Sequence, residues 1–233
     1  MHGWRRARLT EREKQTATGR TLKFEVARWP GHLPGQHVDV RLTAEDGYQA
    51  VRSYSLAAPA DADSIELGVQ AAAGGEVSPY LADDLPVGAE VEVKGPLGGW
   101  FVWTPEEPGP LLLIAGGSGI VPLMAMLRAR TASPSDAPCT LLYSVRSPDD
   151  VWYAPELDAP APHVRVRRLY TRLAPDGSGR PAGRMTTYDL PGPPPAGEGR
   201  CYVCGPTGFV EHATGLLLTT GYPSHQIRTE RFG

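Results

Sequence analysis

The segment at residues 111–123 constrains the fold of this chain more than any other stretch. Five apolar residues at 111–115 precede a cluster of small residues, and a run with helical apolar spacing follows at 122–128. This order predicts a buried parallel strand, a tight turn and a helix. Because glycines let the backbone approach an anion and a helix N-terminus presents free N–H groups, the turn is a candidate dinucleotide site. Its residues are Gly116, Gly117, Ser118 and Gly119.

Two interpretations of this turn remain open from its local sequence. The spacing Gly-Gly-x-Gly-Ile-x-Pro differs from the Gly-x-Gly-x-x-Gly fingerprint of dinucleotide-binding folds, and no P-loop lysine follows it. A plain strand-to-helix turn that binds nothing is therefore the alternative. The sequence of the rest of the chain is needed to choose between a dinucleotide site and a plain turn.

Composition narrows the class of protein. A chain of 233 residues is long enough for two domains of about 100 residues each. Its net charge of −3 gives no reason to expect a nucleic acid or an anionic membrane as a partner. It has no run of about 18 apolar residues and no signal-peptide pattern, so we expect a cytoplasmic protein. Its three cysteines can supply neither a disulfide framework nor the four thiolates of an iron–sulfur cluster.

Residues 1–106 are predicted to form a small antiparallel β-barrel, because short alternating segments are separated by turns. One helix is predicted at 78–85, with Ser78 as its N-cap. The glycine pair before it makes this helix start a second candidate anion site, and a hairpin turn beside a capped helix is the alternative. The expected strands are 21–26, 36–42, 51–57, 64–71 and 90–94.

Residues 107–233 are predicted to form an α/β domain, and the polar, proline-rich segment 103–110 is typical of a linker. Beyond it strands alternate with helices, which predicts a parallel sheet with right-handed crossovers. In addition to the strand and helix at 111–128, the expected strands are 139–145, 163–170, 200–203 and 226–230, and the expected helices are 151–157 and 207–220.

The motif Arg52-Ser53-Tyr54-Ser55 lies on a predicted strand. Alternation places Arg52 and Tyr54 on one face and the two serines on the other. A guanidinium can bind phosphate in bidentate fashion, so this face is a candidate phosphate contact. An ordinary exposed sheet face that carries an arginine and a tyrosine is the plainer alternative.

The Cys201-x-x-Cys204 spacing invites a redox or metal interpretation. On a strand, residues three apart point to opposite faces, which argues against a cysteine pair. Cys204 alone lies at the carboxyl end of a predicted strand, where sheet ligands bind. A small buried hydrophobe is the alternative for it.

Six motifs occur in a fixed order along nearly the whole chain. They are Arg-x-Tyr-Ser at 52–55, Gly-x-x-Ser at 75–78, Gly-Pro-x-Gly at 95–98, Gly-Gly-x-Gly-Ile-x-Pro-Leu at 116–123, Cys-Gly-Pro at 204–206 and Glu-x-Phe at 230–232. Together they resemble the ferredoxin–NADP reductase superfamily, and more narrowly its stand-alone flavin reductases and oxygenase reductase components. The resemblance implies an FAD-binding antiparallel barrel followed by an NAD(P)-binding α/β domain without an iron–sulfur domain.

The resemblance also implies roles on the barrel. Arg52 would hold the FAD pyrophosphate, Tyr54 would pack on the isoalloxazine or ribityl region, and Ser55 would hydrogen-bond near flavin N5. Backbone N–H groups at 75–78 would cradle the pyrophosphate, and the ring of Phe232 would cover the flavin. The flavin-binding residues so implied are Arg52, Ser53, Tyr54, Ser55, Gly75, Glu76, Val77, Ser78 and Phe232.

In the second half, the resemblance implies that Gly116, Gly117, Ser118 and Gly119 receive the nicotinamide dinucleotide, together with Cys204, Gly205 and Pro206. Cys204 would lie beside the nicotinamide and Glu230 would complete the site, so Ser55, Cys204 and Glu230 are the implied catalytic residues. Arg146, Thr171 and Arg172 would lie near the adenosine 2′-phosphate. Thr171-Arg172 resembles the Ser-Arg pair of NADPH-using relatives, which favours NADPH, although NADH-using relatives also carry arginines there.

The resemblance finally implies a function for the chain, and two alternative functions remain open. FAD would accept a hydride from NADPH or NADH, and the electrons would pass to a separate ferredoxin-like or other redox protein. Gln70 departs from the family pattern, because many members carry a basic residue there. The alternatives are a reductase of free flavin or another small molecule, and a non-catalytic docking module on the same fold.

Overall fold

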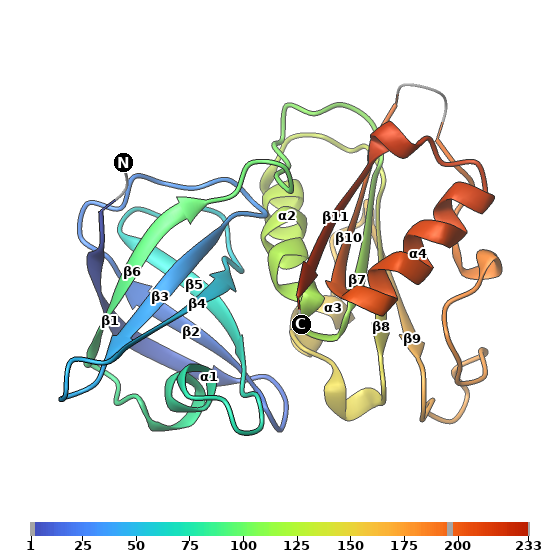
Figure 1. The fold of residues 1–233 in the computed structure, drawn as a ribbon. Coiled ribbons are helices and arrows are strands. Elements are labelled where there is room, and N and C mark those ends of the chain that lie inside the picture. The colour runs from blue at the N-terminus through green and yellow to red at the C-terminus, as the bar shows by residue number, and fades with distance from the viewer. Residues whose placement is uncertain (1–2, 195–197, 233) are drawn as a thin grey trace.

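The molecule contains a six-stranded antiparallel sheet followed by a five-stranded parallel sheet, each in its own domain (Figure 1). The computed structural model describes residues 3–194 and 198–232. The predicted order, an antiparallel barrel and then an α/β domain, is confirmed. The predicted boundary between residues 106 and 107 falls within the connection between the last barrel strand and the first parallel strand.

The barrel has the strand order β4-β3-β6-β1-β2-β5, and a bridge between Leu56 and Leu67 joins its two edges. Its core follows the alternation of the sequence: in β3, for example, Val38 and Val40 are buried while their neighbours are partly exposed. The strands are β1 (Arg5–Lys14), β2 (Gly19–Glu25), β3 (His37–Thr43), β4 (Gln49–Ser55), β5 (Ser64–Gln70) and β6 (Glu90–Leu97).

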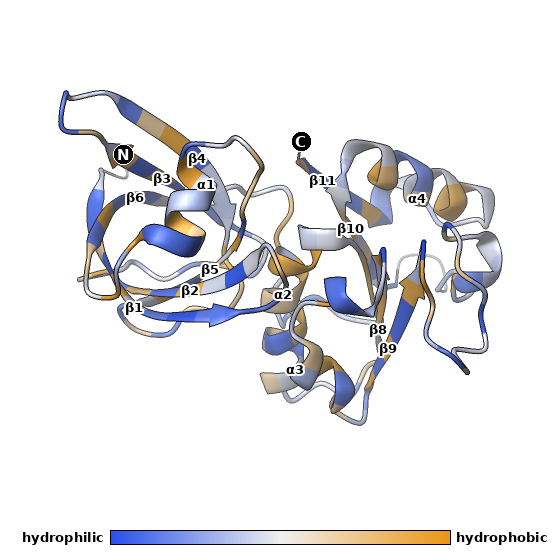
Figure 2. Cartoon of the chain, turned by 90° about the horizontal axis from the view of Figure 1, so that it is seen from below, coloured by the Kyte–Doolittle hydropathy of each residue, from blue (hydrophilic) through white to orange (hydrophobic). Residues whose placement is uncertain are grey.

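Strand β1 was not predicted, because charged residues dominate its sequence. Figure 2 shows this strand as largely hydrophilic. Only Ala7 and Leu9 of this strand are buried. Its arginines are instead satisfied by neighbouring elements: Arg8 pairs with Glu25 of β2, and Arg6 lies 3.3 Å from Glu90 of β6. Cross-strand charge pairs thus replace the apolar alternation that marks the other strands.

The predicted helix at 78–85 begins one residue earlier than expected. It consists of the short helix α1 (Val77–Pro79) and the π-helical turn η1 (Tyr80–Asp84), and its N-cap is Glu76. The prediction that Ser78 is the N-cap is therefore wrong. The Ser78 hydroxyl instead accepts a hydrogen bond of 3.1 Å from the N–H of Ala72, which ties the helix to the loop before it.

The parallel sheet has the order β11-β10-β7-β8-β9 and carries helices on both faces. Apolar residues of α2 and α3 pack on one face and those of α4 on the other (Figure 1). None of the helices in the described ranges combines the length and apolarity needed to cross a bilayer. The elements are β7 (Leu111–Gly116), α2 (Ile120–Ala132), β8 (Cys139–Val145), α3 (Ala154–Asp158), β9 (Val164–Tyr170), β10 (Arg200–Pro206), α4 (Thr207–Thr219) and β11 (Ile227–Phe232).

Three predicted elements of this domain differ from the structure, and one of them is the strand expected at 200–203, which continues to Pro206. The helix expected at 151–157 begins only at Ala154, because Tyr153 adopts a left-handed conformation (φ 55°) and ends the preceding turn. The apolar residues of 151–153 that suggested a helix are buried in the core instead. The last strand continues to Phe232 rather than ending at Glu230, which brings the Phe232 ring to the domain interface.

Helix α2 lies between the barrel and the parallel sheet and joins the domains (Figures 1 and 2). A Cβ at Gly68 of β5 would lie 2.2 Å from Val121 of α2, so only glycine allows this approach. Arg128 of α2 donates to the carbonyl of Ala57 at 3.0 Å and to Glu66 of β5 at 2.6 Å. It also pairs with Glu156 of α3. These contacts fix the position of one domain against the other.

We expect Arg128→Met to lower the melting temperature of the chain by about 5 °C. The substitution keeps the apolar stem but removes charged hydrogen bonds to half-buried Glu66, a loss of about 2 kcal/mol. Arg165→Met, at an exposed position of β9, is the matched control and should leave the melting temperature unchanged. Equal melting temperatures for the two variants would contradict the proposed role of Arg128 at the interface. Differential scanning calorimetry measures both.

Candidate active site

A cavity of about 520 Å³ lies between the two domains. Residues of β4, β5 and α1 line it from the barrel, and Ser118, Val121 and Phe232 line it from the parallel domain. The predicted residues that line it are Arg52, Ser53, Tyr54, Ser55, Gly75, Glu76, Val77, Ser78, Ser118 and Phe232. We call this space the interdomain cavity.

Strand β4 contributes four neighbouring side chains to the barrel wall of this cavity. Arg52 is exposed, and its guanidinium donates only to the neighbouring carbonyl of Val51, at 2.7 Å, within the described chain. Burial raises the pKa of Tyr54 to about 12, so its phenol is protonated at neutral pH. The Ser53 hydroxyl is already bound to Asp39 at 2.6 Å, on the other face of the strand. Arg52 is therefore the residue here that is available to bind an anion.

The loop before α1 differs in one respect from the predicted phosphate cradle. The N–H of Gly75 donates to the carbonyl of Ala72 at 3.0 Å, which closes the loop on itself. The expectation that this N–H helps to cradle the pyrophosphate is therefore not supported. Gly75 still lines the cavity with Glu76, Val77 and Ser78.

A second, smaller cavity of about 250 Å³ adjoins the first. It lies at the carboxyl ends of β7, β8 and β9, where open α/β sheets bind nucleotides, and we call it the sheet-end cavity. Gln70 of β5 and Ser118 line both cavities, so the two spaces meet there. Gly116, Gly117 and Pro206 also line the sheet-end cavity. The predicted glycine turn thus faces Thr16, Thr18 and Gln70 of the barrel across the sheet-end cavity.

Gly119 brings this turn against the neighbouring strand. A Cβ at this position would lie 2.2 Å from the carbonyl oxygen of Cys204 and 2.7 Å from the nitrogen of Gly205. The Gly-Gly-x-Gly and Cys-Gly-Pro motifs are therefore in backbone contact, although they are far apart in the sequence. Such close packing requires glycine.

Cys204 and Glu230 lie opposite each other on β10 and β11, with Sγ and Oε2 3.8 Å apart. Burial raises the pKa of Glu230 to about 7, against a smaller lowering effect of the Cys204 thiol. Burial and the nearby carboxylate raise the pKa of Cys204 well above its usual value, so this thiol stays protonated. Cys201 packs on the opposite face of the sheet, as strand alternation predicts.

The residues expected near a 2′-phosphate are not all brought together. Arg146 and Thr171 line the sheet-end cavity, but Arg172 does not: its side chain is exposed. Asp150, which was not predicted, lines the same cavity. Its carboxylate accepts hydrogen bonds from the N–H and hydroxyl of Ser147, at 3.0 and 2.7 Å, which fix its position.

Several other residues of the sheet-end cavity were missed by sequence reasoning. Thr16 and Thr18 come from the barrel, and Trp152 and Phe209 come from loops and helices of the second domain. Only Ser144 and Val145 carried a signal, because they are the last two residues of the strand predicted at 139–145, directly before Arg146. The others belong to segments without any motif and reach the cavity only through the tertiary fold.

Comparisons with known proteins agree with this geometry. Residues 6–102 match the oxidoreductase FAD-binding domain and residues 113–215 match the oxidoreductase NAD-binding domain. The chain is therefore an oxidoreductase that binds FAD and a nicotinamide dinucleotide. It belongs to the ferredoxin–NADP reductase family.

Individual relatives are similar over nearly the whole chain. A ferredoxin–NAD(P)(+) reductase component of naphthalene 1,2-dioxygenase/salicylate 5-hydroxylase systems from Ralstonia sp. is 32% identical over 96% of this chain and 67% of the relative. A flavohemoprotein from Deinococcus radiodurans is 30% identical over 99% of this chain and 60% of the relative. The chain thus spans about two thirds or less of the length of these relatives. The flavohem-like FAD/NAD-binding domain of a nitric oxide dioxygenase from Vibrio cholerae superposes with a TM-score of 0.84 and 26% identity, each chain fully covered.

The residues present fit both cofactors. The interdomain cavity offers an unpaired guanidinium and an aromatic ring on one wall, and the glycine turn of the second domain opens into the adjoining space. Both cavities together lie within the size range of small-molecule and cofactor sites.

Proposed function

We propose that this chain oxidises NADH through bound FAD and delivers the electrons to a separate redox protein. The observation that carries the proposal is the junction of the two cavities at Gln70 and Ser118. A flavin held by the barrel and a nicotinamide held by the glycine turn would meet at this junction. Bound FAD supplies the chemistry, because it accepts a hydride and can release electrons singly.

The chain's own residues would align the two rings. Arg52 and the backbone of Glu76 to Ser78 would bind the FAD pyrophosphate, while Tyr54 and Ser55 would face the flavin. Gly116 to Gly119 would receive the nicotinamide dinucleotide, and the ring of Phe232, which lines the interdomain cavity, would cover the flavin. Positioning of this kind accounts for much of the rate in hydride transfer.

Glu230 of β11 and Cys204 of β10 line neither cavity and would support the junction of the two cavities from the sheet. A carboxyl group whose pKa is about 7 can hold or release a proton at physiological pH. The protonated Cys204 thiol, 3.8 Å away, would position that carboxyl and pack beside the nicotinamide without acting as a nucleophile.

The choice of NADH rests on the charges of the sheet-end cavity. Arg172, from which the expectation of NADPH was drawn, lies outside it, and the positive charge of Arg146 inside it is opposed by the Asp150 carboxylate, which would repel a 2′-phosphate. We expect a lower KM for NADH than for NADPH. Asp150→Asn, which retains the hydrogen bonds to Ser147, should lower the KM for NADPH about tenfold, because removing one like charge is worth about 1.4 kcal/mol.

Steady-state kinetics with both coenzymes measure this preference. Asp149→Asn is the matched control, because this exposed neighbour does not line the cavity. A wild-type preference for NADPH, or a large effect of Arg172→Ala on the KM for NADPH, would contradict the assignment.

A separate electron acceptor is supported by relatives that are named as reductase components or as an electron transfer component of oxygenase systems. The test is an anaerobic titration of the FAD-loaded chain with NADH, followed by addition of a [2Fe–2S] ferredoxin. We expect bleaching of the flavin and then reduction of the ferredoxin. A colourless protein that takes up no FAD would indicate a docking module instead. FAD that is lost on gel filtration but reduced in solution would indicate a free-flavin reductase.

A further inference from the structure

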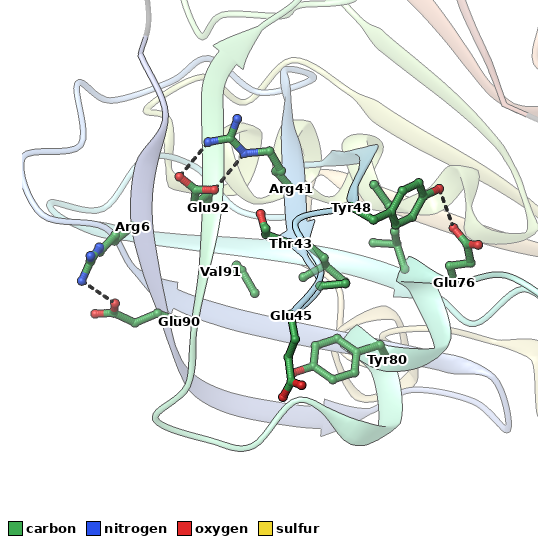
Figure 3. A pocket seen from close by; sticks show the side chains of 14 residues that line it. Arg6, Arg41, Thr43, Glu45, Tyr48, Glu76, Tyr80, Glu90, Val91 and Glu92 are labelled. Atoms are coloured by element: carbon green, nitrogen blue, oxygen red, sulfur yellow. Dashed lines mark hydrogen bonds and ion pairs between the residues drawn. The ribbon is translucent and has the colours of Figure 1, made fainter.

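The parallel domain contains a cavity of about 190 Å³ that is separate from the sites described so far. Among the described residues, it shares no lining residue with the interdomain or sheet-end cavity. Its lining includes the first residues of β7, β8 and β10, so it lies at the end of the sheet opposite the sheet-end cavity, and we call it the strand-start cavity. A cavity of about 730 Å³ beside the β3–β4 hairpin differs in this respect (Figure 3). It shares Glu76 and Val77 with the interdomain cavity and extends the site already described.

The floor of the strand-start cavity is a row of three side chains on adjacent strands. Leu112 of β7 pairs with Cys201 of β10 and with Thr140 of β8, so the three side chains lie on the same face of the sheet. Leu112 and Cys201 are buried and pack in the cluster that includes residues of α4. Burial raises the pKa of Cys201, so its thiol stays protonated and behaves as a small apolar group. The floor is therefore apolar except at Thr140.

The segment 191–194 covers this floor and is held in place by Tyr222. The Tyr222 hydroxyl donates to the carbonyls of Pro191 and Gly192, at 2.9 and 3.1 Å. Pro191, Gly192, Pro194 and the buried Tyr222 all line the cavity. Because proline has no N–H group, the two prolines offer no hydrogen-bond donor to the interior. The roof is thus mainly apolar and fixed to the wall of the cavity.

One buried acceptor in the lining lacks a partner. Gln226, directly before β11, is 1% exposed and lines the cavity. Its Nε2 donates to the carbonyl of Glu198 at 3.0 Å, and because a carbonyl can only accept, this bond fixes the orientation of the amide. Its buried Oε1 has no hydrogen-bond partner among residues 3–194 and 198–232. Buried polar atoms are almost always paired in folded proteins, so a ligand with an N–H or O–H donor would supply the missing partner.

Charge and volume define the class of ligand. Arg200 is the one charged residue in the described lining, and its guanidinium is already occupied by Glu107 at 3.3 Å and by the carbonyl of Gly199 at 3.0 Å. An anion would therefore find no free cation here. An apolar cavity of about 150 Å³ accommodates one benzene ring, so this volume suits a single ring with one small substituent. Water fits less well, because a buried water needs about two to four polar partners and the floor and roof are mainly apolar.

We propose that the strand-start cavity binds a neutral single-ring aromatic molecule that carries one hydroxyl or amino group, of the phenol or aniline class. The ring would lie between Leu112 of the floor and the prolines of the roof, and its hydroxyl or amino group would donate to Oε1 of Gln226. This site is additional to those for FAD and the nicotinamide dinucleotide, and it does not depend on the function proposed above.

Fluorine NMR titrations of the FAD-loaded full chain with para-fluorophenol and with fluorobenzene test the proposal. The two probes differ only in the hydroxyl group. Para-fluorophenol should bind about tenfold more tightly, the effect of one hydrogen bond to a buried acceptor. Saturating NAD⁺ should not change its affinity, because the cavities share no described lining residue. Gln226→Leu, which removes the acceptor and keeps a similar volume, should reduce the difference between the probes to less than about twofold. Gln49→Leu, at an exposed position of β4, is the matched control and should preserve the tenfold difference.

Thr140→Phe places a ring at the polar end of the floor and should abolish the binding of both probes. Equal affinity of the wild type for the two probes, or no binding of para-fluorophenol up to its solubility limit, would overturn the assignment. Displacement of para-fluorophenol by NAD⁺ would also overturn it, because the probe would then occupy the nucleotide site. A Gln226→Leu chain that keeps the wild-type preference for para-fluorophenol would exclude Oε1 as the acceptor. The wild-type comparison and the NAD⁺ competition need no variant, so they decide the matter even where a substitution prevents folding.

Discussion

Replacing Gly119 with valine should slow the reduction of bound FAD by NADH about 100-fold, because a displacement of about 1 Å at the reacting groups costs this much. The Cβ would lie 2.2 Å from the Cys204 carbonyl oxygen, so either the glycine turn or β10 has to move. Ser118, the next residue, lines both cavities and would move with the turn. The interdomain wall formed by Arg52 and Tyr54 is not touched, so FAD should remain bound.

Anaerobic stopped-flow measurement of flavin bleaching gives the rate, and flavin absorbance after gel filtration gives the bound FAD. Gly215→Ala is the matched control: it lies in α4, and a Cβ there meets no atom within 4 Å. This control should reduce its flavin at the wild-type rate. A Gly119→Val chain that is also reduced at the wild-type rate would show that the nicotinamide does not bind at this turn.

The fold was predictable wherever the burial of a strand left a plain periodicity in the sequence. The fully buried β7, followed by the glycine turn and α2, was predicted from its residues because a strand covered on both faces has no polar alternation. Strand β1 escaped prediction because Arg–Glu pairs with its neighbours replace apolar alternation. The start of α1 was misplaced because the Ser78 hydroxyl bonds back to Ala72 rather than capping the helix.

Site residues could be predicted where a motif lies at the end of a strand. They could not be predicted where lining the cavity depends on the direction in which a side chain projects. Arg146 and Thr171 line the sheet-end cavity because parallel strands bring their carboxyl ends to one edge. Arg172 follows Thr171 directly, yet it is exposed and does not line that cavity. Asp150 reaches the cavity through a turn that its own hydrogen bonds to Ser147 define. Sequence spacing alone does not contain such directions.

Glu230→Gln should slow flavin reduction about 100-fold, the order of effect of removing one preorganised electrostatic contact, because the nicotinamide gains positive charge as its hydride leaves and a neutral amide stabilises that charge less than a carboxylate does. It should also remove the pH dependence of this rate near neutrality, since burial raises the pKa of Glu230 to about 7. Glutamine preserves the size of the side chain and its contact with Cys204, so the loss would reflect the missing charge rather than packing. Rates of anaerobic flavin reduction between pH 5.5 and 8.5 test this expectation. A pH profile identical to that of the wild type would exclude a role for the charge of Glu230.

The same substitution should make the chain more stable at high pH. Burial raises the pKa of Glu230 from 4.5 to about 7, so between these values the folded state keeps a proton that the unfolded state releases. Stability therefore falls as the pH rises through this window, by at most about 3 kcal/mol, and stays lower above it. Glu230→Gln removes this penalty: its urea midpoint should exceed that of the wild type at pH 8 and match it near pH 4.5. Glu211→Gln, at an exposed position of α4, should change neither midpoint. A gain in stability together with a loss of rate would show that the buried carboxyl is kept for chemistry and not for folding.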